Sequence, residues 1–559
     1  AYQKKKKYYR LKNGDFLELE NSGIAILSEL TDGLGITEEE FESGTMLIPK
    51  YRANYIDAVT KQAAENVEIT RSRDFRKIIR NMREYQDSDF EIPEGLHATL
   101  RKYQEDGFRW LSTLASWGFG GILADDMGLG KTIQILAFLL SKKKKALIVC
   151  PASLVYNWEA EAAKFVPELK VLLIAGNSEE RKKKLDECTE ADILVTSYDL
   201  LKRDIKNYKD RQFDYMVIDE AQYIKNAGTQ AAKAVKKIHA GTCFALTGTP
   251  VENRLSDLWS IFDFVMPDYL YTYKQFKTQI EQPVVQENDE DARQRLQKMI
   301  SPFILRRKKQ DVLKDLPDKL EKVVYTKLQG EQRKLYEAQV NKLRLELTGK
   351  SDEEFKKESI QYLAELTKLR QICCSPELIY ENYKGVSSKM ETCMELIQNA
   401  VDSEHKILLF SQFTQMLDLI KEELQKRNVL FLYLSGKNTK IQRKNMVEQF
   451  QQGSIPVFLI SLKAGGTGLN LTAADTVIHF DPWWNVAAQN QATDRTHRIG
   501  QKNVVNVLKL VARDTIEEKI IHLQEKKAKL AEDIIEGKET AEHYLSREEI
   551  IDLLSEKDK

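Results

Sequence analysis

The 559-residue sequence lacks the features of a secreted or membrane-embedded protein. Its six cysteines, at positions 150, 188, 243, 373, 374 and 393, include no C-x-x-C pair, so the usual zinc spacing is absent. No apolar run approaches the roughly 20 residues that span a bilayer, and no apolar segment follows the lysine-rich start to form a secretory signal. We therefore expect an intracellular protein without a membrane partner, cytoplasmic or nucleoid-associated in a prokaryote and nuclear in a eukaryote.

Net charge is also missing, because 85 basic residues balance 85 acidic ones. Zero net charge does not exclude nucleic acid, since a local basic channel can lie on a neutral protein. The length allows about three or four domains. The first residue is Ala1 rather than Met, so we expect the chain to be a piece of something longer.

What the sequence does contain is an alternation of short apolar strands with helical segments, in two blocks. This pattern is typical of doubly wound parallel sheets, so we expect an α/β fold with lobes at residues 96–254 and 386–514. Residues 255–385 are charged and mostly helical, and should form protrusions and an inter-lobe linker. Residues 515–559 should form a C-terminal helical brace. The predicted strands are ALIVC, VLLIA, DILVTS, YMVID and CFALTG in the first lobe, and KILLFSQ, FLYLSG, VFLISL, TVIHFD and VNVLKL in the second.

Residues 1–95 are expected to be a small accessory segment. The pair Asn13-Gly14 between two alternating stretches predicts a β-hairpin, and residues 53–86 read as helical. The lysine run at residues 4–7 could contact phosphates, although such runs are more often solvated ends.

A phosphate-binding loop is indicated by ILADDMGLGKTIQILAFLL, residues 122–140. Gly128 and Gly130 would let backbone N–H groups approach phosphates at a helix N-terminus. Lys131 would neutralise phosphate oxygens and Thr132 would ligate Mg²⁺. The common loop pattern has a glycine where this chain has Asp125. The alternative is a tight glycine turn that only caps a helix.

A pair of carboxylates ends the strand YMVIDEAQ. Asp219 would hold Mg²⁺, and Glu220 would orient or deprotonate the attacking water. Acidic residues also end strands as simple caps. Here the carboxylates follow the phosphate-binding loop in the chain, and this order favours the catalytic interpretation.

Two arginines stand together in QNQATDRTHRIGQ, residues 489–501. The spacing predicts that Gln491, Arg495 and Arg498 share one helical face, where two guanidinium groups match the charge that spreads over a transferred phosphoryl group. The alternative is an exposed, salt-bridged helix. His497 is expected to be structural.

Taken together, these motifs resemble the Swi/Snf-type DNA translocases of helicase superfamily two. Further matching motifs follow in the family's order: LRKYQEDGFRWL, ADDMGLGKT, VCPASLVYNW, VTSYDLL, LTGTPVEN, FILRRKKQDVLKDLPDK, LTKLRQICCSPEL and LISLKAGGTGLNLTAADTVIHFDPWWN. The resemblance covers residues 96–520 and explains Asp125, because the family's first motif also lacks the early glycine. Asp126 stands where Glu is commoner, and Gln222 where the family often has His. Residues 1–95 are similar to the segment that precedes the ATPase in bacterial members.

The resemblance implies two RecA-like lobes and a DNA-dependent ATPase that uses ATP and Mg²⁺. It implies movement along double-stranded DNA without strand separation, as a monomeric core that acts on protein–DNA complexes. The implied catalytic residues are Lys131, Asp219, Glu220, Gln222, Arg495 and Arg498. Those implied for ATP are Gln104, Asp126, Met127, Gly128, Leu129, Gly130, Lys131, Thr132, Gly468 and Gln491, and those for Mg²⁺ are Thr132 and Asp219.

The expected DNA contacts come from loops at the carboxyl ends of strands. Hydroxyls, backbone N–H groups and a lysine suit phosphate oxygens, so the contacts should be sequence-independent and salt-sensitive. They are Thr196, Ser197, Lys463, Gly465, Gly466, Thr467 and Trp484. Trp484 could instead be a buried anchor, and the glycines could be plain turn residues.

Several choices stay open at this stage. Arg306 and Arg307 are either structural clips or backbone contacts, whereas Cys373, Cys374 and Trp259 are expected in the core. The rival functions are a strand-separating DNA or RNA helicase and a non-hydrolysing scaffold switched by ATP.

Overall fold

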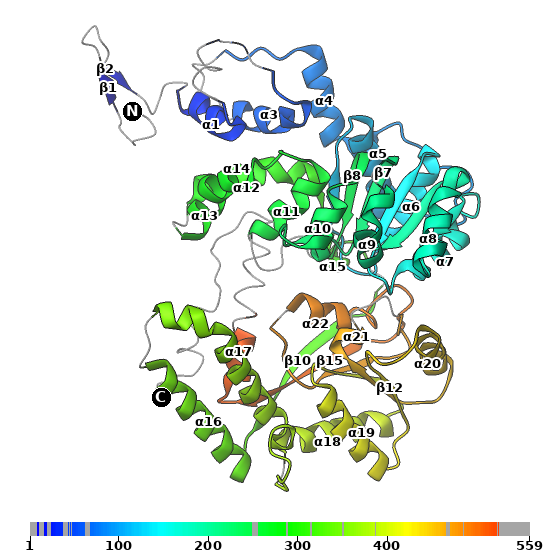
Figure 1. Ribbon diagram of the computed structural model, residues 1–559, viewed down its shortest axis with the longest axis vertical. Helices are drawn as coiled ribbons and strands as arrows, with labels where there is room; N and C mark the ends of the chain where they lie inside the picture. Colours follow the sequence, from blue (N-terminus) through cyan, green and yellow to red (C-terminus); the bar gives the residue numbers. More distant parts are fainter. Residues whose placement is uncertain are drawn as a thin grey trace. The chain divides into compact units, whose positions relative to one another are not determined.

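The computed structural model divides into two compact units (Figure 1). The first contains residues up to Asp126 and from Gly130 to Lys308, and the second is built mainly from residues after Lys308. The residues that the structure describes are 8–10, 16–18, 24–36, 43, 45, 47–61, 68–208, 210–248, 255–286, 289–313, 316–348, 352–385, 387–465, 470–484, 486–522 and 524.

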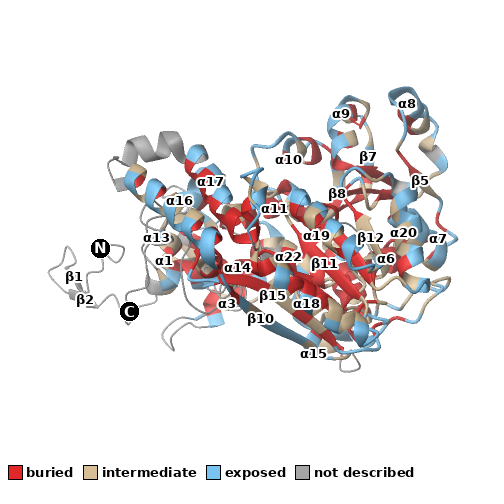
Figure 2. Cartoon of the chain, turned by 90° about the horizontal axis from the view of Figure 1, so that it is seen from below, coloured by how far each residue is buried: buried red, intermediate tan, exposed pale blue. Residues whose placement is uncertain are grey.

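The first unit is built on a seven-stranded parallel sheet of order β5-β6-β4-β7-β8-β3-β9. All five strands predicted in this lobe are confirmed, and most of the residues in the predicted stretches are buried (Figure 2). Such apolar strands need helices on both faces of the sheet. The strands are β3 (Gly121–Leu123), β4 (Ala146–Cys150), β5 (Val171–Leu173), β6 (Ile193–Ser197), β7 (Gln212–Asp219), β8 (His239–Leu246) and β9 (Ile304–Leu305). The flanking helices are α5 (Lys102–Ser116), α6 (Lys131–Lys142), α7 (Val155–Phe165), α8 (Ser178–Asp186), α9 (Tyr198–Tyr208) and α10 (Gln230–Val235).

The second unit contains a six-stranded parallel sheet of order β10-β15-β14-β11-β13-β12. Alternate residues of its central strands face two separate apolar clusters: Leu409 packs with α18 and α19, and Leu408 packs with α20, α21 and α22. Figure 1 shows α18 and α19 on one side of the sheet and α21 and α22 on the other. The strands are β10 (Lys319–Lys327), β11 (Ile407–Ser411), β12 (Phe431–Leu434), β13 (Val457–Ser461), β14 (Thr476–His479) and β15 (Val505–Arg513). The helices are α18 (Ser388–Asp402), α19 (Thr414–Lys426), α20 (Lys440–Gln452), α21 (Leu462–Gly465) and α22 (Val486–Thr493). The doubly wound α/β fold is confirmed in both units.

The interval 255–385 is mostly helical, as expected, but it also contains two strands that the sequence did not indicate. Strand β9 joins the first sheet beside β3, and β10 is the edge strand of the second sheet beside β15. Most of the side chains of β10 are exposed or half-buried, so its sequence lacks the apolar run of a central strand. The helices are α11 (Leu255–Val265), α12 (Tyr273–Phe276), α13 (Gln282–Gln286), α14 (Glu290–Ile300), α15 (Lys309–Val312), α16 (Gly330–Thr348) and α17 (Asp352–Cys374).

The expected hairpin is present at the start of the chain. Strands β1 (Tyr8–Arg10) and β2 (Phe16–Glu18) pair antiparallel; Asn13 and Gly14 lie outside the described residues. The helices that follow are α1 (Ile24–Leu34), α3 (Ala53–Lys61) and α4 (Arg73–Arg83).

At the other end, residues 516–522 are helical, and residues 525–559 lie outside the described part of the chain. Among the described residues, no helix is both long and apolar enough to cross a bilayer. Cys373, Cys374 and Trp259 are buried, which confirms their expected place in the core.

Candidate nucleotide-binding and catalytic site

The predicted nucleotide residues of the first unit lie at the carboxyl edge of its sheet. Strand β3 leads into the glycine loop, β7 ends at Asp219, β8 is followed by Thr247, and β9 is followed by Arg307. All these strands are parallel, so their carboxyl ends meet at one edge, where ligands of open α/β sheets bind.

The glycine loop has the backbone conformation that phosphate binding requires. Gly128 and Gly130 have φ angles of 90° and 79°, and Gly130 is the N-cap of α6. A Cβ atom at Gly130 would lie 2.5 Å from Nε2 of Gln104, so the amide expected to read adenine lies directly beside the loop. The Lys131 ammonium donates to the backbone oxygens of Asp125 at 2.6 Å and Asp126 at 3.4 Å. This cradle fits a triphosphate.

Asp125, which replaces the usual loop glycine, has a fully buried side chain that accepts from three nitrogen atoms of two residues. Its Oδ1 accepts from Nε of Arg307 at 2.8 Å, and its Oδ2 accepts from Nη2 of the same guanidinium. Nε2 of Gln134, on α6, donates to Oδ2 at 3.2 Å. Of the two interpretations left open for Arg307, the structure favours the structural clip.

Asp219 ends β7 inside the unit. Its Oδ2 accepts from Nε1 of Trp158 at 3.1 Å and its Oδ1 from the backbone N of Glu220 at 2.9 Å. Burial and the Glu220 charge raise the pKa of Asp219 above its usual range, while Trp158 and Lys131 act in the opposite direction. Each carboxylate oxygen keeps a second lone pair, so the donor set fits a magnesium ion that also takes oxygens from Thr132 and substrate phosphate.

Glu220 has a left-handed backbone, with φ of 53°, which is rare for this residue type. Such strain persists where the surroundings determine it, often at active sites. Its Oε2 accepts from Nε2 of Gln222 at 2.7 Å, and Oε1 of Gln222 accepts from the Thr247 hydroxyl at 3.2 Å. This chain joins the end of β7 to the end of β8 within the first unit. The structure gives Gln222 these two partners within the first unit.

The candidate arginines of the second unit follow α22. Gln491 lies within that helix, whereas Arg495 and Arg498 lie in the turn after Thr493. The prediction that the three residues share one continuous helical face is therefore wrong.

The backbone hydrogen bonds change after Thr493. The N of Asp494 still donates to the oxygen of Asn490 at 2.8 Å, four residues back, whereas the N atoms of Arg495 and Thr496 donate to oxygens three residues back. Oγ1 of Thr496 donates to the backbone oxygen of Thr493 at 2.7 Å, and Oγ1 of Thr493 lies 2.8 Å from Nε2 of His479. The regular helix therefore gives way to a turn at this point.

Lys309 and His497 hold the turn that carries the arginines. Nζ of Lys309 donates to Oδ1 of Asp494 at 2.7 Å and to the backbone oxygen of His497 at 2.6 Å. Burial lowers the pKa of His497, and its Nε2 lies 2.8 Å from the backbone oxygen of Pro317. A neutral, bonded imidazole fits the structural role expected for His497.

Two of the expected DNA contacts are contradicted by burial. Thr196 and Ser197 are 0% and 2% exposed. The Thr196 hydroxyl donates to the backbone oxygen of Ile174 at 3.2 Å, and the Ser197 hydroxyl accepts from the backbone N of Leu200 at 3.3 Å. Both side chains serve the fold, so neither hydroxyl is available to phosphate oxygens.

The other expected DNA contacts belong to the second unit. Trp484 is half-buried against an apolar cluster, with the Arg370 guanidinium 5.8 Å from its ring centroid, which favours the anchoring interpretation. Stacking on nucleic acid stays a prediction. Lys463 and Gly465 lie in α21, while Gly466, Thr467 and Gly468 lie outside the described residues.

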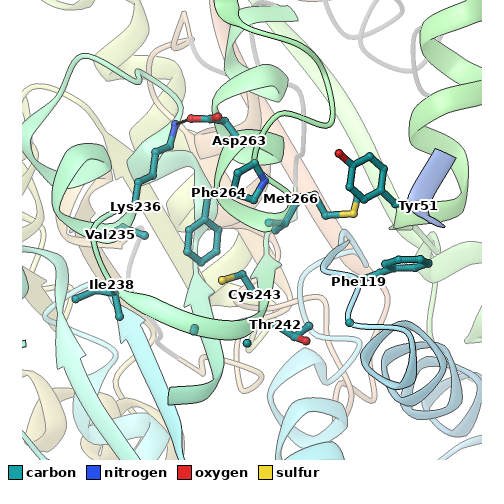
Figure 3. Close-up of a pocket in the computed structure, with 15 residues that line it drawn as sticks. Tyr51, Phe119, Val235, Lys236, Ile238, Thr242, Cys243, Asp263, Phe264 and Met266 are labelled. Atoms are coloured by element: carbon teal, nitrogen blue, oxygen red, sulfur yellow. Dashed lines mark hydrogen bonds and ion pairs between the residues drawn. The ribbon is translucent and has the colours of Figure 1, made fainter. Parts of the chain in front are cut away.

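A cavity of about 240 Å³ lies elsewhere in the first unit (Figure 3). It is lined by Phe119, by residues 240–243 of β8, and by the ion pair of Lys236 with Asp263. It contains none of the predicted nucleotide residues and adjoins residues that precede β3 and begin β8, so it belongs to the opposite edge of the sheet.

Sequence reasoning missed Trp158 and Lys309, which hold the candidate site, and left the role of Arg307 undecided. A signal existed for Arg307, because a buried aspartate in a glycine loop requires a cation. The motif FILRRKK offered several cations, but the short strand β9 that brings one to Asp125 gave no pattern.

Two doubly wound parallel sheets with a glycine loop, a paired carboxylate strand end and an arginine-bearing turn define a helicase-type core. The chain belongs to the SNF2-related family: residues 103–378 match the SNF2-related domain and residues 388–500 the helicase conserved C-terminal domain. Residues 1–93 match the bacterial SNF2 helicase-associated domain. The resemblance read from the motifs, including that of the first segment, is confirmed.

Relatives share a large part of the chain. An "Uncharacterized ATP-dependent helicase" of Mycoplasma pneumoniae is 42% identical over 79% of this chain and 43% of its own length. The "Putative ATP-dependent helicase/translocase YwqA" of Bacillus subtilis is 38% identical over 86% of this chain and 54% of its own. The chain thus spans about half the length of these curated relatives. A solved "Sulfolobus solfataricus SWI2/SNF2 ATPase core in complex with dsDNA" is 39% identical, with a TM-score of 0.41 over 80% of this chain and 96% of that one.

Proposed function

We propose that this chain hydrolyses ATP and uses the energy to move along double-stranded DNA, displacing or remodelling protein–DNA complexes without separating the strands. In this proposal residues 96–254 and 386–514 are the two lobes, residues 255–385 brace the duplex, and residues 515–559 form a C-terminal brace. Residues 1–95 are an accessory to the first lobe.

The observation that carries the proposal is the link from Glu220 through Gln222 to Thr247, at the edge where the glycine loop lies. It fixes a carboxylate that can orient an attacking water and ties it to the loop after β8. A change at the nucleotide can therefore reach a second loop of the same unit.

Residues of this chain divide the work on ATP. The loop N–H groups and Lys131 bind phosphate oxygens, and Gln104 lies where it can contact the base. Magnesium, held by Asp219 and Thr132, would supply charge neutralisation at the β- and γ-phosphates. Arg495 and Arg498 stabilise the charge that develops on the transferred group.

Double-stranded DNA as the track rests on the family and on the kind of contacts available. The relatives are named helicase or helicase/translocase. No residue in the candidate loops is built to read base edges, so binding should be independent of sequence and weaken with salt. The rival is a strand-separating helicase on DNA or RNA.

ATP turnover with different nucleic acids tests the proposal. We expect double-stranded DNA to stimulate turnover strongly, and the stimulation to weaken as salt rises. We also expect triplex displacement without unwinding of a forked duplex. Equal stimulation by single strands or RNA would favour the helicase instead, and ATP binding without turnover on any of them would favour a scaffold.

Substitution of Lys131 or Glu220 should abolish that turnover while the chain stays folded. Lys131→Ala removes the cation for the phosphates, and Glu220→Gln removes the carboxylate that orients water. We expect each to lower the turnover number on the order of 10²–10³-fold, the range for a transition-state contact. Lys206→Ala and Glu179→Gln change exposed residues of the same unit and should have no effect. Normal DNA-stimulated turnover in Lys131→Ala or Glu220→Gln would contradict the assignment.

A further inference from the structure

We infer that the segment Arg307–Lys309 is a two-ended clamp, in which Arg307 positions the nucleotide-binding loop and Lys309 positions the turn that carries Arg495 and Arg498. The inference rests on the proposed ATPase function and assigns these two cations as positioning residues for it. The chain passes from the first unit to the second between Lys308 and Lys309, so the clamp lies at the connection itself.

The first end is built on the backbone of the loop. The backbone N of Ala124 donates to the oxygen of Leu305 at 2.7 Å, and that of Asp126 to the oxygen of Arg307 at 3.1 Å. The residues that open the loop therefore extend the pairing of β3 with β9 to Arg307.

The Arg307 side chain then ties together the elements that surround the nucleotide loop. Besides its bidentate pair with Asp125, it donates to Oε1 of Gln134 on α6 at 2.7 Å and to the backbone oxygen of Tyr103 at the start of α5. Asp125 is also the residue whose backbone oxygen holds Lys131. The position of the phosphate-binding lysine therefore depends on how Arg307 holds Asp125.

A glycine within α5 shows that the helix accommodates this network. Gly107 lies in the interior of α5, where glycine destabilises a helix relative to alanine. A Cβ atom there would overlap Oε1 of Gln134 and lie 2.9 Å from Nη2 of Arg307. Glycine at 107 leaves the space that Arg307 and Gln134 occupy.

The second end is the Lys309 ammonium, whose side chain is 6% exposed. It donates to Asp494, which immediately precedes Arg495, and to the backbone oxygen of His497, which immediately precedes Arg498. Because the regular helix has already ended at Thr493, these bonds add to the backbone bonds of the turn, such as that from Thr496 N to the oxygen of Thr493 at 3.0 Å. Lys309 contacts the arginine-bearing turn within the second unit, as Arg307 contacts the loop within the first.

Nucleotide affinity tests the first end, measured with fluorescent methylanthraniloyl-ATP and Mg²⁺ in the absence of DNA. Arg307→Gln and Asp125→Asn should each raise the Kd about tenfold, as expected for residues that orient ligand-binding groups. The double variant should be no weaker than either single one, because both remove one interaction. Arg307→Lys, which keeps the charge without the fork, should give an intermediate Kd.

The matched control is Arg181, whose buried bidentate pair with Asp204 lies in the same unit on α8 and α9. Arg181→Gln should lower the melting temperature without changing the Kd, and should leave amide exchange of residues 124–135 unchanged, whereas Arg307→Gln accelerates it. Gly107→Ala should raise the Kd although it removes no charge and favours helix. If wild type binds the probe, and Arg307→Gln, Asp125→Asn and Gly107→Ala bind it with the same Kd, the inference is overturned and the proposed function stands. If wild type binds no probe, both are overturned.

Turnover tests the second end. Lys309→Gln should leave the Kd of the probe within about twofold and lower kcat about tenfold, because the turn with the arginines loses its support. Lys509→Gln breaks a comparable lysine–glutamate pair of the second unit, 2.6 Å from Glu321, and should change neither value. An unchanged kcat in Lys309→Gln, or the same loss in Lys509→Gln, would overturn the role of Lys309.

Discussion

At the scale of single residues, the site depends on side chains that would look misplaced if each were considered alone. Asp125 is a buried carboxylate in a phosphate-binding loop, and Glu220 is a non-glycine residue with positive φ. Each is held by a specific partner, Arg307 for the first and Gln222 for the second. Buried charges and strained backbones persist only where neighbours compensate them, so the partners are as informative as the residues themselves.

Trp158 is such a partner for the carboxylate expected to hold magnesium. It is 2% exposed, and its indole N–H donates to Oδ2 of Asp219. Trp158→Phe keeps an aromatic ring but removes the donor, so the Asp219 carboxylate loses one of the hydrogen bonds that fix its orientation. We expect the Mg²⁺ concentration for half-maximal turnover to rise about tenfold, typical for loss of a group that orients a metal ligand. Magnesium titration of turnover checks this.

Trp259→Phe provides the control for the loss of a tryptophan. Its indole N–H donates to the backbone oxygen of Tyr271 in the same unit, and its ring centroid lies 5.2 Å from the Lys236 ammonium. It should lower the melting temperature and leave the magnesium dependence unchanged. An identical magnesium titration in Trp158→Phe and wild type would show that the indole only packs.

At the scale of elements, apolar runs were sufficient to locate ten of the strands. The ten predicted strands, from ALIVC to VNVLKL, are all present. Strands β9 and β10 were missed for physical reasons: β9 has two residues, and β10 is an edge strand whose charged side chains face solvent. The helix expected through Arg498 ends at Thr493, where backbone bonds to oxygens four residues back give way to bonds three residues back, a local change that hydrophobic periodicity does not reveal.

The same contrast applies to the candidate site. The places of Lys131, Asp219 and Glu220 at the carboxyl edge of the sheet were predictable, because glycines and paired carboxylates follow apolar strands at fixed positions; their catalytic roles stay predictions. Thr196 was misjudged, since a position at a strand end does not show whether a hydroxyl points outward or bonds within the fold. Arg307 was undecided because its partner Asp125 is brought to it only by the missed strand β9.

The edge strand β10 is tied to β15 by charge, which makes its stability depend on pH. Burial alone would raise the pKa of Glu321, but Lys319 and Lys509 outweigh it and lower that pKa to about 2. Because this value lies below that of the unfolded chain, about 4.3, the pair stabilises the fold above that pH and loses its contribution as the pH falls toward 2. Glu321→Gln should therefore cost about 1 kcal/mol at pH 7, a figure reduced for the partial exposure of the carboxylate.

Thermal unfolding of wild type and Glu321→Gln between pH 7 and pH 3 measures this effect. The difference in melting temperature should be largest at neutral pH and should shrink as the pH falls below 4. Glu448 provides the control, because its pair with Lys444 is 3.8 Å long and exposed on α20, so Glu448→Gln should have little effect at any pH. A difference that stays constant over the whole range would show that Glu321 acts through packing.

At the scale of the whole molecule, the family-matched N-terminal segment is integrated with the first unit. Oη of Tyr271, in the turn after α11, donates to the backbone oxygen of Gly33 at the end of α1. Glu29 pairs with Lys298 of α14 at 2.9 Å. These contacts join residues far apart in sequence, so α1 and α3 complete the packing of the helices that follow the seven-stranded sheet.

Deletion of residues 1–95 should therefore destabilise the first unit. The buried Arg52 guanidinium lies 4.8 Å from the ring centroid of Tyr269 and 5.0 Å from that of Tyr271, and deletion would expose both rings. We expect the first unit to melt about 5 °C or more lower, since a few kcal/mol of packing are lost. The point substitution Arg52→Gln should give a smaller shift in the same direction. Deletion of residues 1–23 leaves α1 and α3 in place and should shift the melting temperature less than either. If deletion of residues 1–95 leaves both the melting temperature and ATP turnover unchanged, the segment is an independent appendage. If the deletion lowers both together, the first unit needs this segment to hold its helices, and the helicase-associated match marks a structural part of that unit.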